Sequence, residues 1–108
     1  MALISAANGD QTAVLDTEHT LATISSAGIF ALVVDMSNMV NGDRTVLRMK
    51  TKCRAGATSR LAYEAIFAHV QGDPNKYSIP VPSDTEVICT LEQTDGTGRS
   101  YEWNLLSL

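Results

Sequence analysis

The side chains of this sequence that could bind a metal or act as nucleophiles are few and widely spaced. They are His19, His69, Cys53 and Cys89. They form no CxxC or HxxxH pair, and no serine stands in a GxSxG turn that would present a nucleophile. We therefore expect no metal, no cofactor, no catalytic residue and no enzymatic activity. Each cysteine lies in an apolar alternating segment, which favours two buried free thiols, although a disulfide between them stays open.

The acidic residues do not indicate hydrolysis by paired carboxylates. Several of them stand in turns, such as Asp10, Asp43 and Asp95. The run Asp95-Gly96-Thr97-Gly98 has the glycines of a phosphate-binding loop but lacks its lysine and serine. We interpret this run as the turn of a hairpin.

The cations are concentrated in one region. Six of the eight Lys and Arg residues lie between Arg44 and Arg60, although the net charge is −4. The basic stripe, as we call it here, consists of Arg44, Arg48, Lys50, Lys52 and Arg54. It could be a solvated strand face with acidic partners, a surface that docks on an acidic protein, or a nucleic-acid contact. The acidic balance and the lack of interleaved aromatic residues argue against direct nucleic-acid binding.

The elements that would position these side chains are strands. Frequent turn residues separate short stretches rich in Val, Ile, Thr, Tyr and Phe, which predicts an all-β antiparallel β-sandwich, jelly-roll-like, with about eight strands in one domain over residues 1–108. The expected strands are Thr12–Asp16, Thr20–Ile24, Ile29–Met36, Thr45–Cys53, Ala62–Val70, Lys76–Pro80, Glu86–Gln93 and Arg99–Leu106.

The segment from Leu61 to Val70 fits two patterns. Tyr63, Ile66, Phe67 and Val70 follow a helical stripe, whereas alternate residues from Tyr63 follow a strand face equally well. We favour the strand because the segment lies among β elements and has no capping box.

Alternation also predicts the core. Two neighbouring segments flank the turn at Gly96 and would pair as a hairpin, with Leu91 opposite Tyr101, Cys89 opposite Trp103 and Val87 opposite Leu105. The core candidates are Leu47, Met49, Cys53, Val87, Cys89, Leu91, Tyr101, Trp103 and Leu105.

Three segments are candidates for contact with other proteins. Ile29–Met36 is apolar at nearly every position, as expected of a strand covered on both faces. Ile79 and Val81 alternate with two prolines, which places them at a sheet edge. The N-terminal segment 1–10 is too apolar for a free tail, so we expect a neighbouring subunit to order it.

No apolar run approaches the about 18 residues of a membrane-spanning helix, and the N-terminus lacks the pattern of a signal peptide. We therefore expect a soluble protein that is made without export and has no membrane partner.

Three stretches of the sequence carry a resemblance to a known group of proteins. Leu21–Asp35, Leu47–Lys52 and Leu91–Leu108 resemble small virion proteins of tailed bacteriophages, and within that group capsid decoration (cement) proteins. The resemblance implies a small β-sandwich or jelly roll without catalytic residues that binds the major capsid protein. It also implies a homo-oligomer, a dimer or a trimer, and a place on the outer capsid surface of a virion assembled in the host cytoplasm.

Two other functions remain open. A phage tail or head-tail connector subunit would also be a compact β domain. A carbohydrate-binding or adhesin module would present exposed aromatic rings, with Trp103, Tyr101, Tyr63 and Tyr77 as candidates.

Overall fold

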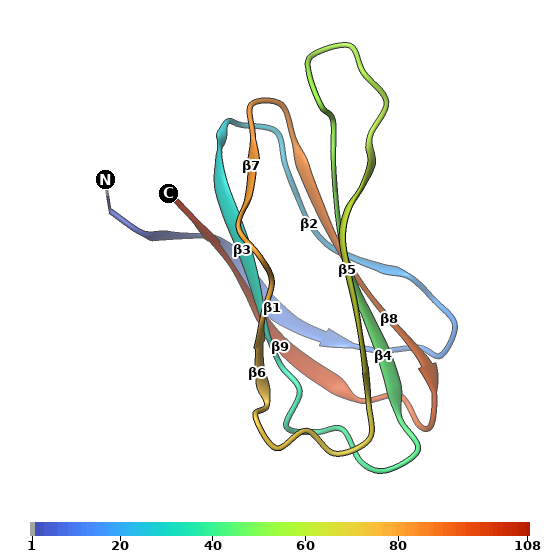
Figure 1. Ribbon diagram of the computed structural model, residues 1–108. Coiled ribbons are helices and arrows are strands. Elements are labelled where there is room, and N and C mark those ends of the chain that lie inside the picture. Colours follow the sequence, from blue (N-terminus) through green and yellow to red (C-terminus); the bar gives the residue numbers. More distant parts are fainter. Residues whose placement is uncertain (1) are drawn as a thin grey trace.

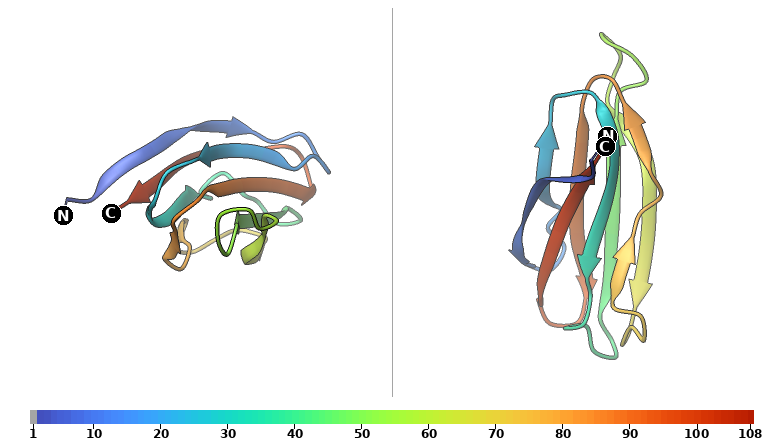
Figure 2. Two further views of the ribbon diagram at one scale, coloured as in Figure 1. Left: turned by 90° about the horizontal axis from the view of Figure 1, so that it is seen from above. Right: turned by 90° about the vertical axis from the view of Figure 1, so that its left-hand side faces the viewer.

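The computed structural model describes residues 2–108, which form two antiparallel sheets packed face to face (Figures 1 and 2). The strands are β1 (Ile4–Thr12), β2 (His19–Ile24), β3 (Gly28–Asp35), β4 (Arg44–Thr51), β5 (Arg60–Ala68), β6 (Asn75–Tyr77), β7 (Val81–Ser83), β8 (Val87–Asp95) and β9 (Ser100–Ser107). The first sheet has the order β1-β9-β3-β6, with β7 also paired to β3, and the second has the order β2-β8-β4-β5. The all-β sandwich is confirmed.

The strand pairing is nested. β1 pairs with β9, β2 with β8, β3 with both β6 and β7, and β4 with β5. A chain that folds back on itself and rolls into two sheets in this way is a jelly roll. β6 and β7 share the position of one strand beside β3, which explains why nine strands fill a fold expected to have about eight.

The segment from Leu61 to Val70, which fits both a helical and a strand pattern, forms strand β5 up to Ala68. Tyr63, Ala65 and Phe67 lie opposite Met49, Leu47 and Thr45 of β4, so the period of two describes it and the helical stripe does not.

The expected strand Thr12–Asp16 is wrong. The chain turns after Thr12, and Asp16 has a φ of 61°, a left-handed conformation that ends any extended run. The strand lies earlier, at β1, whose polar residues and Gly9 hide its pattern. Residues 4–12 pair with β9 of the same chain, whereas the sequence analysis expected a neighbouring subunit to order residues 1–10; Met1 lies outside the described residues.

The predicted hairpin register is also wrong. β8 pairs with β2 and β4 in the second sheet, whereas β9 pairs with β1 and β3 in the first. Leu91, Cys89 and Val87 therefore do not pair with Tyr101, Trp103 and Leu105. Because side chains alternate in the same way whether the partner strand lies beside or across the sandwich, the pattern alone could not distinguish the two arrangements.

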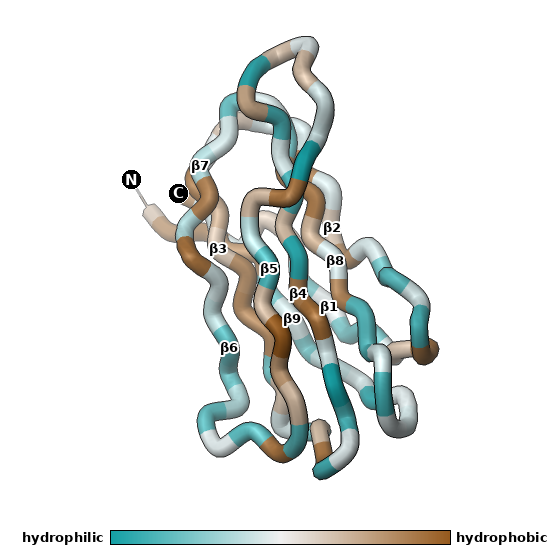
Figure 3. The backbone as a smooth tube through the Cα atoms, turned by 45° about the vertical axis from the view of Figure 1, so that its right-hand side comes forward, coloured by the Kyte–Doolittle hydropathy of each residue, from teal (hydrophilic) through white to brown (hydrophobic). Residues whose placement is uncertain are grey.

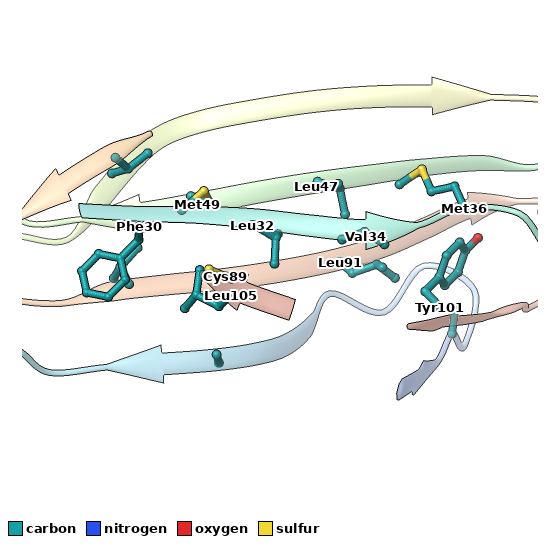
Figure 4. Close-up of a cluster of buried hydrophobic side chains, with 14 of the residues drawn as sticks. Phe30, Leu32, Val34, Met36, Leu47, Met49, Cys89, Leu91, Tyr101 and Leu105 are labelled. Atoms are coloured by element: carbon teal, nitrogen blue, oxygen red, sulfur yellow. The ribbon is translucent and has the colours of Figure 1, made fainter. Parts of the chain in front are cut away.

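The core fills the space between the two sheets (Figure 4). Most of its side chains come from β3, β4, β8 and β9, and Ala13, Ala22, Met36, Met39 and Val81 complete it. Among the core candidates, the buried ones are Leu47, Met49, Val87, Cys89, Leu91, Tyr101 and Leu105.

Two core candidates differ from this set. Cys53 is exposed because β4 ends at Thr51 and the chain leaves the sheet there. Trp103 is half-buried at the side of the core, where a Cβ on Gly9 would lie 3.3 Å from its ring.

A buried glutamine forms hydrogen bonds across the turn between β8 and β9, which joins the two sheets. Gln93, which is 0% exposed, accepts hydrogen bonds from the Tyr101 hydroxyl at 2.9 Å and the Arg99 N–H at 3.0 Å. Its amide nitrogen donates to the carbonyl oxygens of Asp95 at 3.0 Å and Thr97 at 2.7 Å. The side chain of Gln93 thus forms hydrogen bonds with the end of β8, with the turn and with the start of β9.

The two thiols should differ in reactivity. Burial raises the pKa of Cys89 to about 12, whereas Cys53 is exposed, and both are free. We expect a thiol reagent near neutral pH to label one cysteine per folded chain and two per chain in denaturant, measured by mass spectrometry. Labelling of both thiols in the folded protein, or of neither, would contradict this structure.

Truncation of Gln93 should weaken the whole fold. Gln93→Ala leaves the Tyr101 hydroxyl and three backbone groups without their partner, so we expect a loss of about 2–4 kcal/mol in the free energy of unfolding, measured by denaturant titration. The control is Gln11→Ala, because Gln11 bonds only the carbonyl of its neighbour Thr12 and should change stability little. Equal losses in the two variants would argue against this role of Gln93.

Candidate functional site

The basic stripe lies on the outer face of the second sheet, and Arg48 is at its centre. Its Nε lies 2.7 Å from Glu64 Oε2, and its Nη1 lies 2.9 Å from Glu92 Oε1 and 3.3 Å from Glu18 Oε2. The hydrogen bonds that Arg48 donates to these carboxylates, to Glu64 first, raise the pKa of Arg48 above its ordinary value. Arg48 is thus surrounded by acids from different parts of the chain.

Other members of the stripe also have partners. Lys50 lies 3.2 Å from Glu18 and Lys52 lies 3.3 Å from Glu86. Arg44 donates to the Thr94 hydroxyl at 3.0 Å. The stripe therefore matches the interpretation of a solvated face with acidic partners, and Arg48, Lys50 and Lys52 do not offer unpaired charge to a docking protein.

The remaining member, Arg54, lies in the loop between β4 and β5, which projects beyond the sandwich (Figure 1). Arg54 and Arg60 are both exposed and, within residues 2–108, neither forms an ion pair. With Cys53 they line a shallow hollow of about 440 Å³.

A second surface is apolar and lies on the outer face of the first sheet. Ile29, Ala31 and Val33 of β3 alternate with the buried Phe30, Leu32 and Val34 and point away from the core. Residues of neighbouring strands lie beside them on the same face. This apolar face consists of Ile29, Ala31, Val33, Tyr77, Pro82, Leu106 and Leu108.

Several members of the apolar face are strongly exposed. Ile29 is 43% exposed, Leu108 44% and Tyr77 63%. Ile79, between β6 and β7, is 57% exposed, and Figure 3 shows apolar colouring around β7 and the C-terminal end of the chain. Within residues 2–108 no segment covers the outer side of β3, so the chain itself buries one of the two faces that the sequence analysis expected to be covered.

Val81 cannot serve as a contact residue. It lies opposite Phe30 with its side chain in the core, 5% exposed. Because successive side chains point to opposite faces, Pro82 takes the outward position instead. Leu106 and Leu108, which belong to the apolar face, were not singled out from the sequence, because only the pairing of β9 with β3 brings them beside Ile29 and Ala31.

One end of the apolar face is hollowed. An open depression of about 370 Å³ is lined by Val33, Asp35, Asn75, Tyr77, Glu102, Trp103 and Asn104. Of the four aromatic residues considered for carbohydrate binding, Tyr101 is fully buried and Tyr63 and Trp103 are half-buried, which leaves Tyr77 as the exposed ring.

Within residues 2–108, no group of three or more His, Cys, Asp and Glu side chains could hold a metal ion. No helix long and apolar enough to cross a membrane occurs in that part of the chain.

The chain was compared with protein families, curated proteins and solved structures. No protein-family model and no curated protein matches the sequence. A solved structure, "Structure of infectious bursal disease virus Gx strain", is similar with a TM-score of 0.45 and 13% sequence identity. The match covers 99% of this chain and 32% of that chain.

The acidic partners of the stripe should make stability depend on pH. A hydrogen bond from Thr90 lowers the pKa of Glu18 from its ordinary value of 4.5, burial opposes this, and Lys50 and Arg48 lower it further. A lowered pKa in the folded state contributes stability above the ordinary value, and this stability is lost as the pH falls through the lowered pKa.

We therefore expect Glu18→Gln to reduce the free energy of unfolding at pH 7 by at most about 1 kcal/mol, because the pair is partly exposed. The difference from wild type should shrink as the pH falls below the ordinary value of 4.5 and vanish once the carboxyl group of Glu18 is protonated in the folded protein. Denaturant titrations at a series of pH values measure it, with the exposed Glu102→Gln as control. A Glu18→Gln deficit that persists unchanged in acid would contradict the proposed ionic origin.

Proposed function

We propose that this chain is a structural subunit of a tailed-phage virion that binds the outer surface of the head and stabilises contacts between major capsid subunits. The resemblance of Leu21–Asp35, Leu47–Lys52 and Leu91–Leu108 to decoration proteins suggests this role. The observation that carries it is the apolar face of the first sheet, which no other part of the described chain covers.

The apolar face has the properties of a contact surface. Burial of contiguous apolar side chains away from water is favourable, so an exposed apolar patch on a soluble domain marks a binding site. Ile4, although 58% exposed, does not extend this face, because it lies opposite the buried Ser107 and its side chain points to the other side of the sheet.

Binding to an assembled shell would stabilise it by mass action. A subunit that binds only the expanded lattice adds its binding free energy to the resistance of that lattice against opening. Since many copies bind one shell, each contact can be modest. The partner in this proposal is the major capsid protein, and its contact surface should be apolar because the paired cations of the second sheet contribute little attraction.

The apolar face can be tested with a matched pair of variants. Ile29→Lys places a charge at a position that is 43% exposed, and Val40→Lys does the same at 44% exposure in the loop before β4. We expect Ile29→Lys to weaken binding to expanded heads at least about tenfold, which is 1.4 kcal/mol or more, and Val40→Lys to bind like wild type.

Co-sedimentation of purified protein with undecorated expanded heads and with unexpanded shells measures this binding, and the melting temperature of the heads reports stabilisation. Saturable binding to expanded heads with a raised melting temperature is the expected result. Absence of binding overturns the proposal, and self-assembly into rings or tubes without any capsid would favour the tail or connector function.

A second candidate function rests on the hollow around Tyr77. An exposed tyrosine ring beside amide and carboxylate side chains is a surface on which a neutral sugar can stack and form hydrogen bonds. If the chain is a carbohydrate-binding module, Tyr77→Ala should abolish binding to neutral oligosaccharides in calorimetry. Head binding in the preceding experiment would remain unchanged in that variant only if the hollow lies outside the capsid contact.

A further inference from the structure

The outer edges of the two sheets differ in how they are protected against pairing with another chain. An edge strand presents unpaired backbone N–H and C=O groups, which can accept a strand from a second molecule. Proteins limit this with short strands, prolines, bulges and charges. The edge strands here are β1 and β6 with β7 in the first sheet, and β2 and β5 in the second.

Three of these edges carry such devices. β1 has an irregularity between Ser5 and Ala7, and β2 has one between Thr20 and Ala22. β6 and β7 have three residues each, and Pro80 and Pro82 interrupt that edge. Neither β2 nor the edge of β6 and β7 offers a long regular ladder, and the regular part of β1, from Ala7 to Thr12, is mostly polar and contains Gly9 and Asp10.

The edge of β5 is different. Its irregularity lies near its start, between the residues that face Met49 and Lys50, so the pairing from Tyr63 to Ala68 is regular. This run contains no proline and no lysine. Its one acid, Glu64, has its carboxylate 2.7 Å from Arg48 of its own sheet. The run from Tyr63 to Ala68 therefore has no proline, lysine or bulge that would oppose pairing with another strand.

The side chains of β5 are apolar on its inner face from Tyr63 to Phe67, and its outer face carries Ile66 and Ala68 beside Glu64. Tyr63, Ala65 and Phe67 point toward the sandwich and are half-buried, while Ile66 on the outer face is 51% exposed. Figure 3 shows apolar stretches in β5 separated by a hydrophilic one, and β5 has β4 as its neighbour on one side only. A long, regular, apolar edge of this kind is a site of association.

We propose that β5 pairs antiparallel with β5 of a second copy of this chain, so that the second sheets of the two copies form one continuous sheet. Antiparallel pairing of a strand with itself has a two-fold axis, which closes the assembly as a dimer. This inference goes beyond the proposed function and does not depend on it.

The side chains favour a register centred on Ala65. In that register Tyr63 of each copy lies opposite Phe67 of the other, which forms two cross-strand aromatic pairs around a pair of small alanines. A register centred on Glu64 would instead place two carboxylates directly opposite each other, which is unfavourable. The nearly symmetric spacing of Tyr63 and Phe67 about Ala65 is the self-complementarity that selects a second copy as the occupant.

Sedimentation velocity over a concentration series tests the proposal with a matched pair of variants. In the register centred on Ala65, position 66 lies opposite Glu64 of the second copy, so Ile66→Glu places two carboxylates opposite each other at the exposed edge. Val14→Glu adds the same charge at a 61% exposed position in the loop after β1. We expect a wild-type dimer, at least about tenfold weaker self-association of Ile66→Glu, and a Val14→Glu dimer like wild type. Thermal melts confirm that each variant is folded.

Hydrogen exchange and cross-linking locate the contact. In wild type, alternate amides between Tyr63 and Ala68 should exchange more slowly as the protein concentration rises, while those of β6 and β7 should not change. In a Cys53→Ser background, Ala65→Cys should form a disulfide-linked dimer under mild oxidation, because residues at the axis lie directly opposite. Gly72→Cys, beyond the end of β5, should not.

Three results would overturn the proposal. The first is a wild-type monomer at every concentration. The second is an oligomer that persists unchanged in Ile66→Glu while the β5 amides exchange at a rate independent of concentration. The third is a dimer in which Ala65→Cys forms no cross-link. Since all of these measurements use the free protein, they are separate from the outcome of the head-binding experiment.

Discussion

The crossing from β8 to β9 is the constraint on which the two-sheet arrangement depends. Each of these strands is flanked on both sides in its own sheet, so the turn between them joins the interiors of both sheets. Gln93 binds both ends of this turn, and the Thr45 hydroxyl adds a hydrogen bond of 2.8 Å to the Tyr101 oxygen beside it.

The turn between β8 and β9 also requires glycine. A Cβ on Gly96, whose φ is 88°, would collide with the Asp43 carboxylate, and a Cβ on Gly98 would collide with the Ala13 carbonyl. Asp43 itself is held by Arg99 at 2.9 Å and the Val40 N–H, and although its burial favours the neutral form, these hydrogen bonds keep its pKa below the ordinary value.

The fold class followed from local information, whereas strand partners did not. Turn residues and the period of two located β2, β3, β4, β5, β8 and β9 and most of the buried side chains. β1 was missed because its residues are not patterned by burial: Ile4 is 58% exposed, and the strand exists because β9 supplies the ladder. The register of β8 against β9 was wrong because alternation reports which face is buried and carries no information on which strand lies alongside.

The candidate surfaces show the same division. The cations of β4 are visible in the sequence, but their partners Glu18, Glu64 and Glu92 come from three distant segments that only the folded second sheet brings around Arg48. The apolar face likewise combines β3 with the end of β9 and with β7. Ile29 could be predicted as a contact residue from the apolar run that contains it. Leu106 could not, since its neighbours are set by pairing across more than seventy positions of sequence.

The nested pairing also governs how the chain can reach this structure during synthesis. β4 and β5 are neighbours in the chain and can form a hairpin as soon as both have left the ribosome, whereas β1 has no strand to pair with until Ser100–Ser107 emerges. Closing such a long loop before its contacts form is slow, so folding should begin at the β4–β5 hairpin and finish with the β1–β9 pair. Throughout translation the nascent chain therefore carries an apolar β3 whose central partner has not yet been made, and this is the interval in which a chaperone would protect it.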